Sequence, residues 1–244
     1  MTEAATSEAT KLKTKRVKKV EDWPSYIRDN SEFIQNNTQV KNPPLLPEIK
    51  LYLSEVFNAL WRVTETRFEA KNIPPPFWSF AWPGGQALAR YVLDNPDIVR
   101  GKRVFDFASG SGLCAIAATM SGAANVVAND VDPLSIVAIG MNASANDVSV
   151  DVLHDNKINR DLPDIDVILA GDFCYEWPMA GYAIEWLRAQ VKQGKTVLMA
   201  DPGRNYLPKE GLQKLAEYDV ATPLEVEDSE MKHTTIYRLL VEEE

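Results

Sequence analysis

Residues 103–132 read RVFDFASGSGLCAIAATMSGAANVVANDVD and decide the fold of the chain. The apolar and aromatic residues of 103–107 predict a short strand that leads into a turn of small residues, 108–112. Alanine, leucine and isoleucine dominate 113–120 and predict a helix, and the apolar run 125–128 predicts a second strand. Together they predict the opening strand-helix-strand unit of a sheet that binds a nucleotide cofactor.

The turn at 108–112 is the expected ligand site. A helix that starts just after it directs unpaired N–H groups and the positive end of its dipole at the turn. Asp130 lies 20 residues beyond Gly110, the spacing at which such units present a carboxylate to ribose hydroxyls. The residues expected to hold a nucleoside are therefore Ala108, Ser109, Gly110, Gly112, Asp130 and the adjoining Val131.

Two cofactor classes fit this unit, and Asp106 separates them. Nicotinamide and flavin sheets use G-x-G-x-x-G, whose third position here is Ala115, to bind a pyrophosphate. A carboxylate on the strand just before the turn would repel a pyrophosphate but accept hydrogen bonds from an ammonium group. S-adenosylmethionine, which carries adenosine, a sulfonium and an α-amino group, suits it better. A dinucleotide enzyme, or a strand-turn-helix unit without a ligand, is the alternative.

Composition describes an ordinary globular protein. The chain has 244 residues, 45% hydrophobic and 25% charged, and no apolar run near the ~18 residues of a membrane span. Cys114 and Cys174 are too few for a disulfide scaffold or a zinc site, so we expect no metal and a reducing compartment, the cytoplasm of a bacterium or the mitochondrial matrix of a eukaryote. His154 and His233 are expected to be packing residues.

Charge is distributed unevenly. Residues 1–20 contain six basic and two acidic side chains, and the remainder contains 20 basic and 33 acidic ones. The basic segment reads as a disordered arm, with a transit peptide as the alternative. The acidic body disfavours nucleic acid as a partner, because phosphate contacts dominate that binding. It suits a partner that presents lysines.

The region before residue 101 is expected to be a helical extension, 21–100, that forms one domain with the core, 101–244. Residues 23–39 and 48–60 predict two helices, the second amphipathic. After the prolines 74–76, the stretch FWSFAWPGGQALARYVL, 77–93, predicts an aromatic loop and a helix. We expect Phe77 and Phe80 to cover the end of the sheet, and Trp82 to close over the methionine end of the cofactor by cation-π attraction.

The remaining elements alternate as in a parallel sheet. Predicted helices are 133–146, 180–191 and 212–215, and predicted strands are 148–153, 167–170, 195–200, 218–224 and 234–241. Ligands bind beyond the carboxyl ends of parallel strands. The strand 167–170 therefore brings Gly171, Asp172 and Tyr175 beside the transferable methyl group, and the loop 201–206 is expected at the same edge.

Four stretches carry a resemblance to a known family: FWSFAWPGGQALARYVLDNP (77–96), DFASGSG (106–112), AGDFCYE (170–176) and DPGRNYLP (201–208). They resemble protein lysine methyltransferases that act on the electron transfer flavoprotein β subunit, including bacterial members. DFASGSG is similar to the D-x-G-x-G-x-G motif of class I methyltransferases, with Ala108 in place of the first glycine. AGDFCYE matches the D/E-x-x-Y/F signature of seven-β-strand lysine methyltransferases at Asp172 and Tyr175.

The resemblance implies an α/β, Rossmann-like fold: a seven-stranded, mostly parallel sheet with helices on both faces. It implies S-adenosylmethionine as methyl donor, S-adenosylhomocysteine as product, and lysines of the electron transfer flavoprotein β subunit as acceptors. We also expect a monomer that binds neither nucleic acid nor membrane. It also implies that Asp155, beside Asn156, contacts the adenine amino group; a turn cap is the other interpretation.

Methyl transfer to lysine needs a neutral amine, because a protonated lysine cannot attack the sulfonium methyl. We expect Asp172 to draw the ammonium in and Tyr175 to orient the amine, neither as a strict general base. Two other functions remain: methylation of a ribosomal protein or a small amine, and binding of S-adenosylmethionine without catalysis. The cofactor half of the chain is shared by all three.

Overall fold

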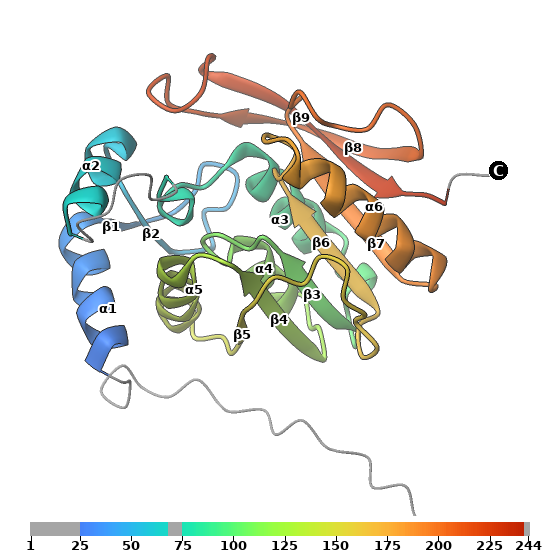
Figure 1. Cartoon of the computed structure of the whole chain (residues 1–244), viewed down its shortest axis with the longest axis horizontal. Coiled ribbons are helices and arrows are strands. Elements are labelled where there is room, and N and C mark those ends of the chain that lie inside the picture. The colour runs from blue at the N-terminus through green and yellow to red at the C-terminus, as the bar shows by residue number, and fades with distance from the viewer. Residues whose placement is uncertain (1–24, 68–74, 242–244) are drawn as a thin grey trace, which may run out of the picture.

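A computed structural model describes residues 25–67 and 75–241 (Figure 1). The predicted basic arm, 1–20, and Trp23 lie outside the described residues. The core contains β3 (Arg103–Phe107), α4 (Leu113–Met120), β4 (Asn125–Asp130), α5 (Pro133–Ala145), β5 (Asp151–His154), β6 (Val167–Gly171), α6 (Met179–Lys192), β7 (Thr196–Asp201), β8 (Leu212–Ala221) and β9 (Met231–Leu239).

These strands form one seven-stranded sheet in the order β5-β4-β3-β6-β7-β9-β8. The five strands from β5 to β7 are mutually parallel, and β9 is antiparallel to both β7 and β8. The chain leaves β3 toward β5 on one side and returns to β6 on the other. The predicted fold class is therefore confirmed, and the reversal of strand order falls between the carboxyl ends of β3 and β6.

Helices cover both faces of the sheet because the strands are apolar on both sides. Val104 of β3 packs with α3 (Pro83–Asp94), α4 and part of α5. Its neighbour Phe105 points to the opposite face and packs with α6. Asp132 caps α5 by accepting a hydrogen bond from the Leu134 N–H, and Pro133 occupies the first turn.

The N-terminal extension differs from its prediction in one element. It contains α1 (Ser25–Asn37), β1 (Gln39–Lys41), β2 (Leu51–Leu53), α2 (Phe57–Arg67) and the short helices η2 (Phe77–Ser79) and η3 (Pro96–Ile98). The predicted helix 48–60 is wrong: β2 pairs with β1, and α2 begins at Phe57. Ile49, Leu51 and Leu53 are buried in alternation, and Asn142 accepts a hydrogen bond from the Tyr52 N–H, which holds this segment extended.

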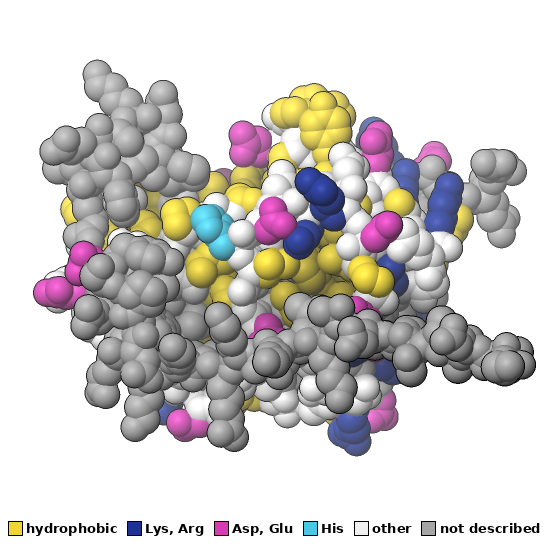
Figure 2. All heavy atoms as spheres, turned by 60° about the horizontal axis from the view of Figure 1, so that its bottom comes forward, with side chains coloured by type: hydrophobic (Ala, Val, Ile, Leu, Met, Phe, Trp, Pro, Cys, Tyr) yellow, Lys and Arg dark blue, Asp and Glu magenta, His cyan; other side chains and the backbone are white. Residues whose placement is uncertain are grey.

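The C-terminal hairpin and the histidines also correct the sequence predictions. Residues 212–215 are not a helix but the start of β8, because pairing with β9 overrides local propensity. His154 and His233 are exposed rather than packed, whereas both cysteines are buried and free. Within the described residues, no helix has the length and apolar character that crossing a bilayer requires. The surface in Figure 2 mixes both signs of charge with exposed hydrophobic side chains near the middle of that face.

Candidate functional site

The predicted ligand loop joins β3 to α4 in an unusual backbone conformation. Ala108, Gly110 and Gly112 all have positive φ, at 51°, 55° and 83°. Alanine tolerates this region poorly, so the turn is held by its contacts rather than by local preference. A Cβ on Gly112 would lie 3.2 Å from the Ile139 side chain. The loop therefore has room for backbone alone at its second glycine.

Asp106 is the buried charge of this loop. Its carboxylate accepts hydrogen bonds from the Ser109 hydroxyl and from the Ala115 N–H at 3.1 Å. Burial raises the pKa of Asp106 to about 7, and the nearby charge of Asp130 adds to the rise. A buried carboxylate with a raised pKa is stabilised by a cationic partner. This buried acceptor therefore fits an ammonium group, which donates hydrogen bonds, and does not fit a pyrophosphate.

Asp130 ties the ends of β3 and β4 together. Its two oxygens accept hydrogen bonds from the Gly110 N–H at 2.8 Å and the Asp132 N–H at 2.9 Å. Burial raises its pKa. The adjoining Val131 is 62% exposed, so its side chain stands at the surface beside this carboxylate.

Asp155 and Asn156 follow β5 on the exposed side of the site. Asp155 pairs with Lys157 at 2.7 Å, and this hydrogen bond lowers its pKa. Asn156 accepts a hydrogen bond from the Ile158 N–H at 3.0 Å, as a turn cap does. Both side chains have partners within their own turn, and the contact of Asp155 with adenine stays a prediction.

Trp82 lies in a cluster of rings at the start of α3. Its indole N–H donates to the Phe77 carbonyl at 2.8 Å, and its ring meets those of Phe57 and Phe80 edge-on, with centroids 5.8 and 5.0 Å apart. The guanidinium carbon of Arg204 lies 5.8 Å from its centroid. The cation beside this ring in the structure is therefore Arg204, and contact with the methionine end of a cofactor stays a prediction.

The end of β6 is pressed against the start of α3. A Cβ on Gly171 would lie 3.1 Å from the Gly85 Cα, and one on Gly84 would lie 2.6 Å from the Asp172 Cβ. Close packing is thus one reason for glycine at 171. Asp172 itself has φ of 57° and donates its N–H to the Ala200 carbonyl at 2.9 Å.

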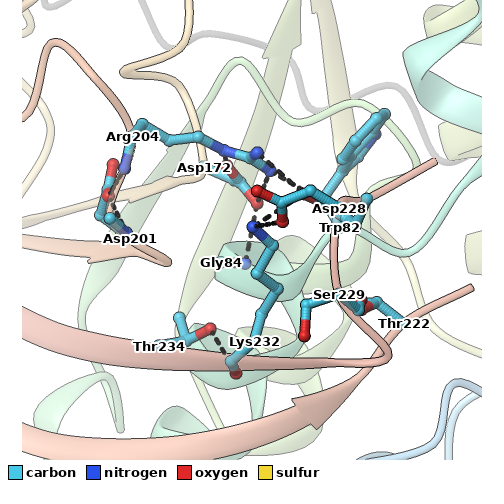
Figure 3. A network of polar contacts seen from close by, with 12 residues as sticks. Trp82, Gly84, Asp172, Asp201, Arg204, Thr222, Asp228, Ser229, Lys232 and Thr234 are labelled. Carbon is cyan, nitrogen blue, oxygen red and sulfur yellow. Dashed lines mark hydrogen bonds and ion pairs between the residues drawn. The ribbon is translucent and has the colours of Figure 1, made fainter. Parts of the chain in front are cut away.

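The carboxylate of Asp172 is almost fully engaged (Figure 3). Oδ1 accepts from Arg204 Nε at 2.6 Å, and Oδ2 accepts from Arg204 Nη2 at 3.2 Å and from the Gly84 N–H at 3.0 Å. Burial raises the pKa of Asp172, against the pull of Arg204. Burial also opposes the charge of Arg204, yet the hydrogen bonds that it donates to Asp172 and Glu227 raise its pKa above the usual value.

Tyr175 stands at the mouth of this region. Its side chain is 40% exposed, and its ring centroid lies 5.1 Å from that of Phe77. Burial, with the charge of Glu176, raises its pKa to about 12, so the hydroxyl stays neutral and can donate or accept. Trp177 is 63% exposed, and its ring centroid lies 6.1 Å from that of Tyr206 in the loop after β7.

The structure brings the two halves of the predicted site to one edge. Phe107 of β3 pairs in parallel with Ala170 of β6, so the loop 108–112 and Asp172 follow neighbouring strands. Asp155 follows β5, two strands from β3. Sequence reasoning placed the loop 201–206 at this edge but missed the roles of Arg204 and Glu227. The motif DPGR was visible, whereas Glu227 carries no sequence signal.

Comparisons with known proteins identify the family of the chain. A family model described as ribosomal protein L11 methyltransferase (PrmA) matches residues 86–171. The electron transfer flavoprotein beta subunit lysine methyltransferase of Xenopus laevis is 37% identical, with 84% of this chain and 85% of that one covered. The human protein of the same name is 37% identical over 84% of this chain and 80% of its own.

The chain belongs to the electron transfer flavoprotein β subunit lysine methyltransferase family. It is a methyltransferase that uses S-adenosylmethionine, as the resemblance predicted. The ribosomal protein L11 methyltransferase of Actinobacillus succinogenes is 49% identical over only 26% of this chain and 21% of its own. A solved Thermoplasma acidophilum protein shares the fold, with a TM-score of 0.50 and 14% identity over 64% of this chain and 88% of that one.

Proposed function

We propose that this protein methylates lysine side chains of the electron transfer flavoprotein β subunit. The observation that carries the proposal is the meeting of a cofactor loop and an Asp-x-x-Tyr pair at the adjacent ends of β3 and β6. Relatives named for this substrate align over 84% of the chain. The cofactor half alone would not distinguish substrates.

Different residues would bind different parts of the methyl donor, which supplies a methyl group activated by its sulfonium charge. Asp106 would accept from the α-amino group, because it is a buried carboxylate with a raised pKa. Asp130 would accept from ribose hydroxyls, while the backbone of Ser109 and Gly110 lines the loop. Val131, Asp155 and Asn156 would flank the adenine, and Trp82 and Gly171 the methionine end.

The acceptor lysine must arrive neutral and aligned. An unperturbed lysine has a pKa near ~10.4, so only about one in 10³ is neutral at pH 7. Entry into a desolvated site lowers that pKa. Tyr175 would orient the amine through its neutral hydroxyl. Asp172 would contribute the negative charge that draws the ammonium in, with one lone-pair position left on Oδ1 after its three hydrogen bonds.

Exposed aromatic side chains support a protein rather than a small amine as substrate. Tyr175, Trp177, Tyr182 and Tyr206 are each at least 40% exposed. Tyr175 and Trp177 follow β6, Tyr182 lies in α6, and Tyr206 follows β7. Large exposed aromatic groups are common anchors of protein interfaces. We also propose a reducing compartment, because Cys114 and Cys174 are both free and buried. A monomeric enzyme stays a prediction.

The test uses purified protein, labelled S-adenosylmethionine and the electron transfer flavoprotein of the same organism. We expect label in the β subunit, removed when its modified lysines, located by mass spectrometry, are changed to arginine. Ribosomal protein L11 serves as the second substrate, since part of the cofactor half resembles its methyltransferases. Label in L11 and none in the flavoprotein would overturn the proposal.

A further inference from the structure

A chain of alternating charges links the end of β6 to the loop between β8 and β9, residues 222–230. Arg204 binds Asp172 on one side and Glu227 on the other, at 3.1 Å from Nη1 to Oε2 and through Nη2 to Oε1. Lys232 of β9 lies 3.4 Å from Glu227. The side chains of Asp172 and Glu227 are only 3% and 4% exposed. Figure 3 shows Arg204 between Asp172 and this loop.

The turn that contains Arg204 is fixed by hydrogen bonds of its backbone. Oδ1 of Asp201 accepts hydrogen bonds from the N–H groups of Gly203 at 2.7 Å and of Arg204 at 2.6 Å. Gly203 has φ of 93°, in the region that favours glycine. The turn D-P-G-R therefore directs the arginine back toward the end of β6.

The loop 222–230 is closed on itself, so Glu227 is a fixed anchor. Thr222 donates its N–H to the Glu230 carbonyl at 2.9 Å and its hydroxyl to the Ser229 carbonyl at 2.6 Å. The Glu227 N–H donates to the Pro223 carbonyl at 3.1 Å. The planar, forked guanidinium of arginine can donate to two carboxylates at once.

We infer that Arg204, anchored by Glu227, is a positioning residue for methyl transfer: it keeps the Asp172 carboxylate charged and fixes the one direction from which an acceptor can approach it. The inference rests on the proposed function. A buried carboxylate without a partner would take up a proton or turn away. The β8–β9 loop thereby contributes to the reaction through Glu227, which contacts Arg204, which in turn contacts Oδ1 of Asp172.

The first experiment follows Asp172 itself in the cofactor-free protein, by ¹³C NMR titration of its carboxyl carbon. The charged and titratable groups that influence Asp172 are Arg204, Glu227, Asp201, Cys174 and Tyr175. Arg204→Gln should move the titration to higher pH, because the counter-charge is lost. Glu227→Gln should move it to lower pH, because a repelling charge is lost. No shift for Arg204→Gln, or a shift to lower pH, overturns the inference.

The second experiment measures single-turnover methylation and cofactor affinity. Arg204→Lys should slow methyl transfer about 10- to 100-fold and Glu227→Gln about 3- to 10-fold, with cofactor affinity unchanged. In an Asp172→Asn background neither change should slow transfer further, because both act through Asp172. Full effects in that background, or a wild-type rate for Arg204→Lys, overturn it.

Arg103→Gln is the matched control, since Arg103 also binds an aspartate beside β6, through two hydrogen bonds at the opposite end of the strand. It should change neither the Asp172 titration nor the rate. An inactive wild-type protein on every substrate would contradict the proposed function instead, while the NMR shifts would still decide the role of Arg204. Glu227→Gln and Arg204→Lys keep the test available if Arg204→Gln does not fold.

Discussion

Strand β6 has an aspartate paired with an arginine at each end, and the two pairs differ in almost everything except chemistry. Asp166, just before the strand, binds Arg103 at 2.8 Å, and their side chains are 36% and 44% exposed. Asp172, just after it, binds Arg204 at 2.6 Å, and theirs are 3% and 18% exposed. The hydrogen bond from Arg103 lowers the pKa of Asp166 to about 2, whereas burial raises that of Asp172.

The difference shows what solvent does to one ion pair. Water screens the exposed pair and can solvate either partner when the other is lost. The buried pair has no water to replace a lost partner, so removing either member leaves a desolvated charge. Parallel strands bind ligands at their carboxyl ends. The buried pair therefore lies where its charge can act on a substrate, and the exposed pair lies where it can only support the fold.

The strongest test of this contrast is Asp172→Ala. Methylation should fall by at least about 10³-fold, because both the acceptor-side charge and the partner of Arg204 are lost. Cofactor affinity should change far less, which calorimetry with S-adenosylmethionine checks. Single turnover at saturating cofactor isolates transfer from binding. Asp172→Asn is the control, because it keeps the shape of the side chain and removes only its charge. Near wild-type turnover would reduce Asp172 to a strand-end cap and redirect attention to 201–206.

Tyr175→Phe tests a second side chain that follows β6, the hydroxyl of Tyr175. The ring that contacts Phe77 stays, and only the hydroxyl is lost. We expect a rate loss of about 10- to 10³-fold, comparable with the loss of one positioned hydrogen bond in a transition state. Single-turnover rates measure it, with Tyr218→Phe on β8, which also loses only a hydroxyl, as the control. A loss as large as that of Asp172→Ala would make the hydroxyl the main catalytic group.

Asp106 tests whether burial also governs the cofactor side of the edge. Its pKa is raised to about 7, so below that pH the folded protein holds a proton that an incoming ammonium must displace. Affinity for S-adenosylmethionine should weaken about tenfold per pH unit below 7 and level off above it. Calorimetry at pH 6 in two buffers should show about one proton released. Asp106→Asn should show no such dependence of affinity on pH. If the affinity of the wild type is also independent of pH, Asp106 does not bind the amino group.

Sequence alone predicted the sheet around 103–132 because buried parallel strands and small-residue turns have strong local patterns. It failed at 48–60 and 212–215, where β2 and β8 form by pairing with a neighbouring strand along the chain and not by propensity. It named Asp172 as the group that draws the ammonium in but did not predict a partner for it. The Arg204 partner comes from another loop, and Glu227 from a third, so no local pattern could join them.

The smallest effect is expected from Asp166→Asn at the other end of β6. Because the pKa of Asp166 is lowered to about 2, its pair with Arg103 stabilises the fold above the unfolded value near ~3.9 and loses that contribution as the pH falls toward 2. The pair is more than a third exposed, so screening keeps even the neutral-pH contribution small. Melting temperatures of the variant and the wild type should differ slightly at pH 7 and converge in acid, and the methylation rate should stay within about twofold. A tenfold loss of methylation in Asp166→Asn would mean that exposure does not separate the two ends of the strand, and the role assigned to burial at Asp172 would fail with it.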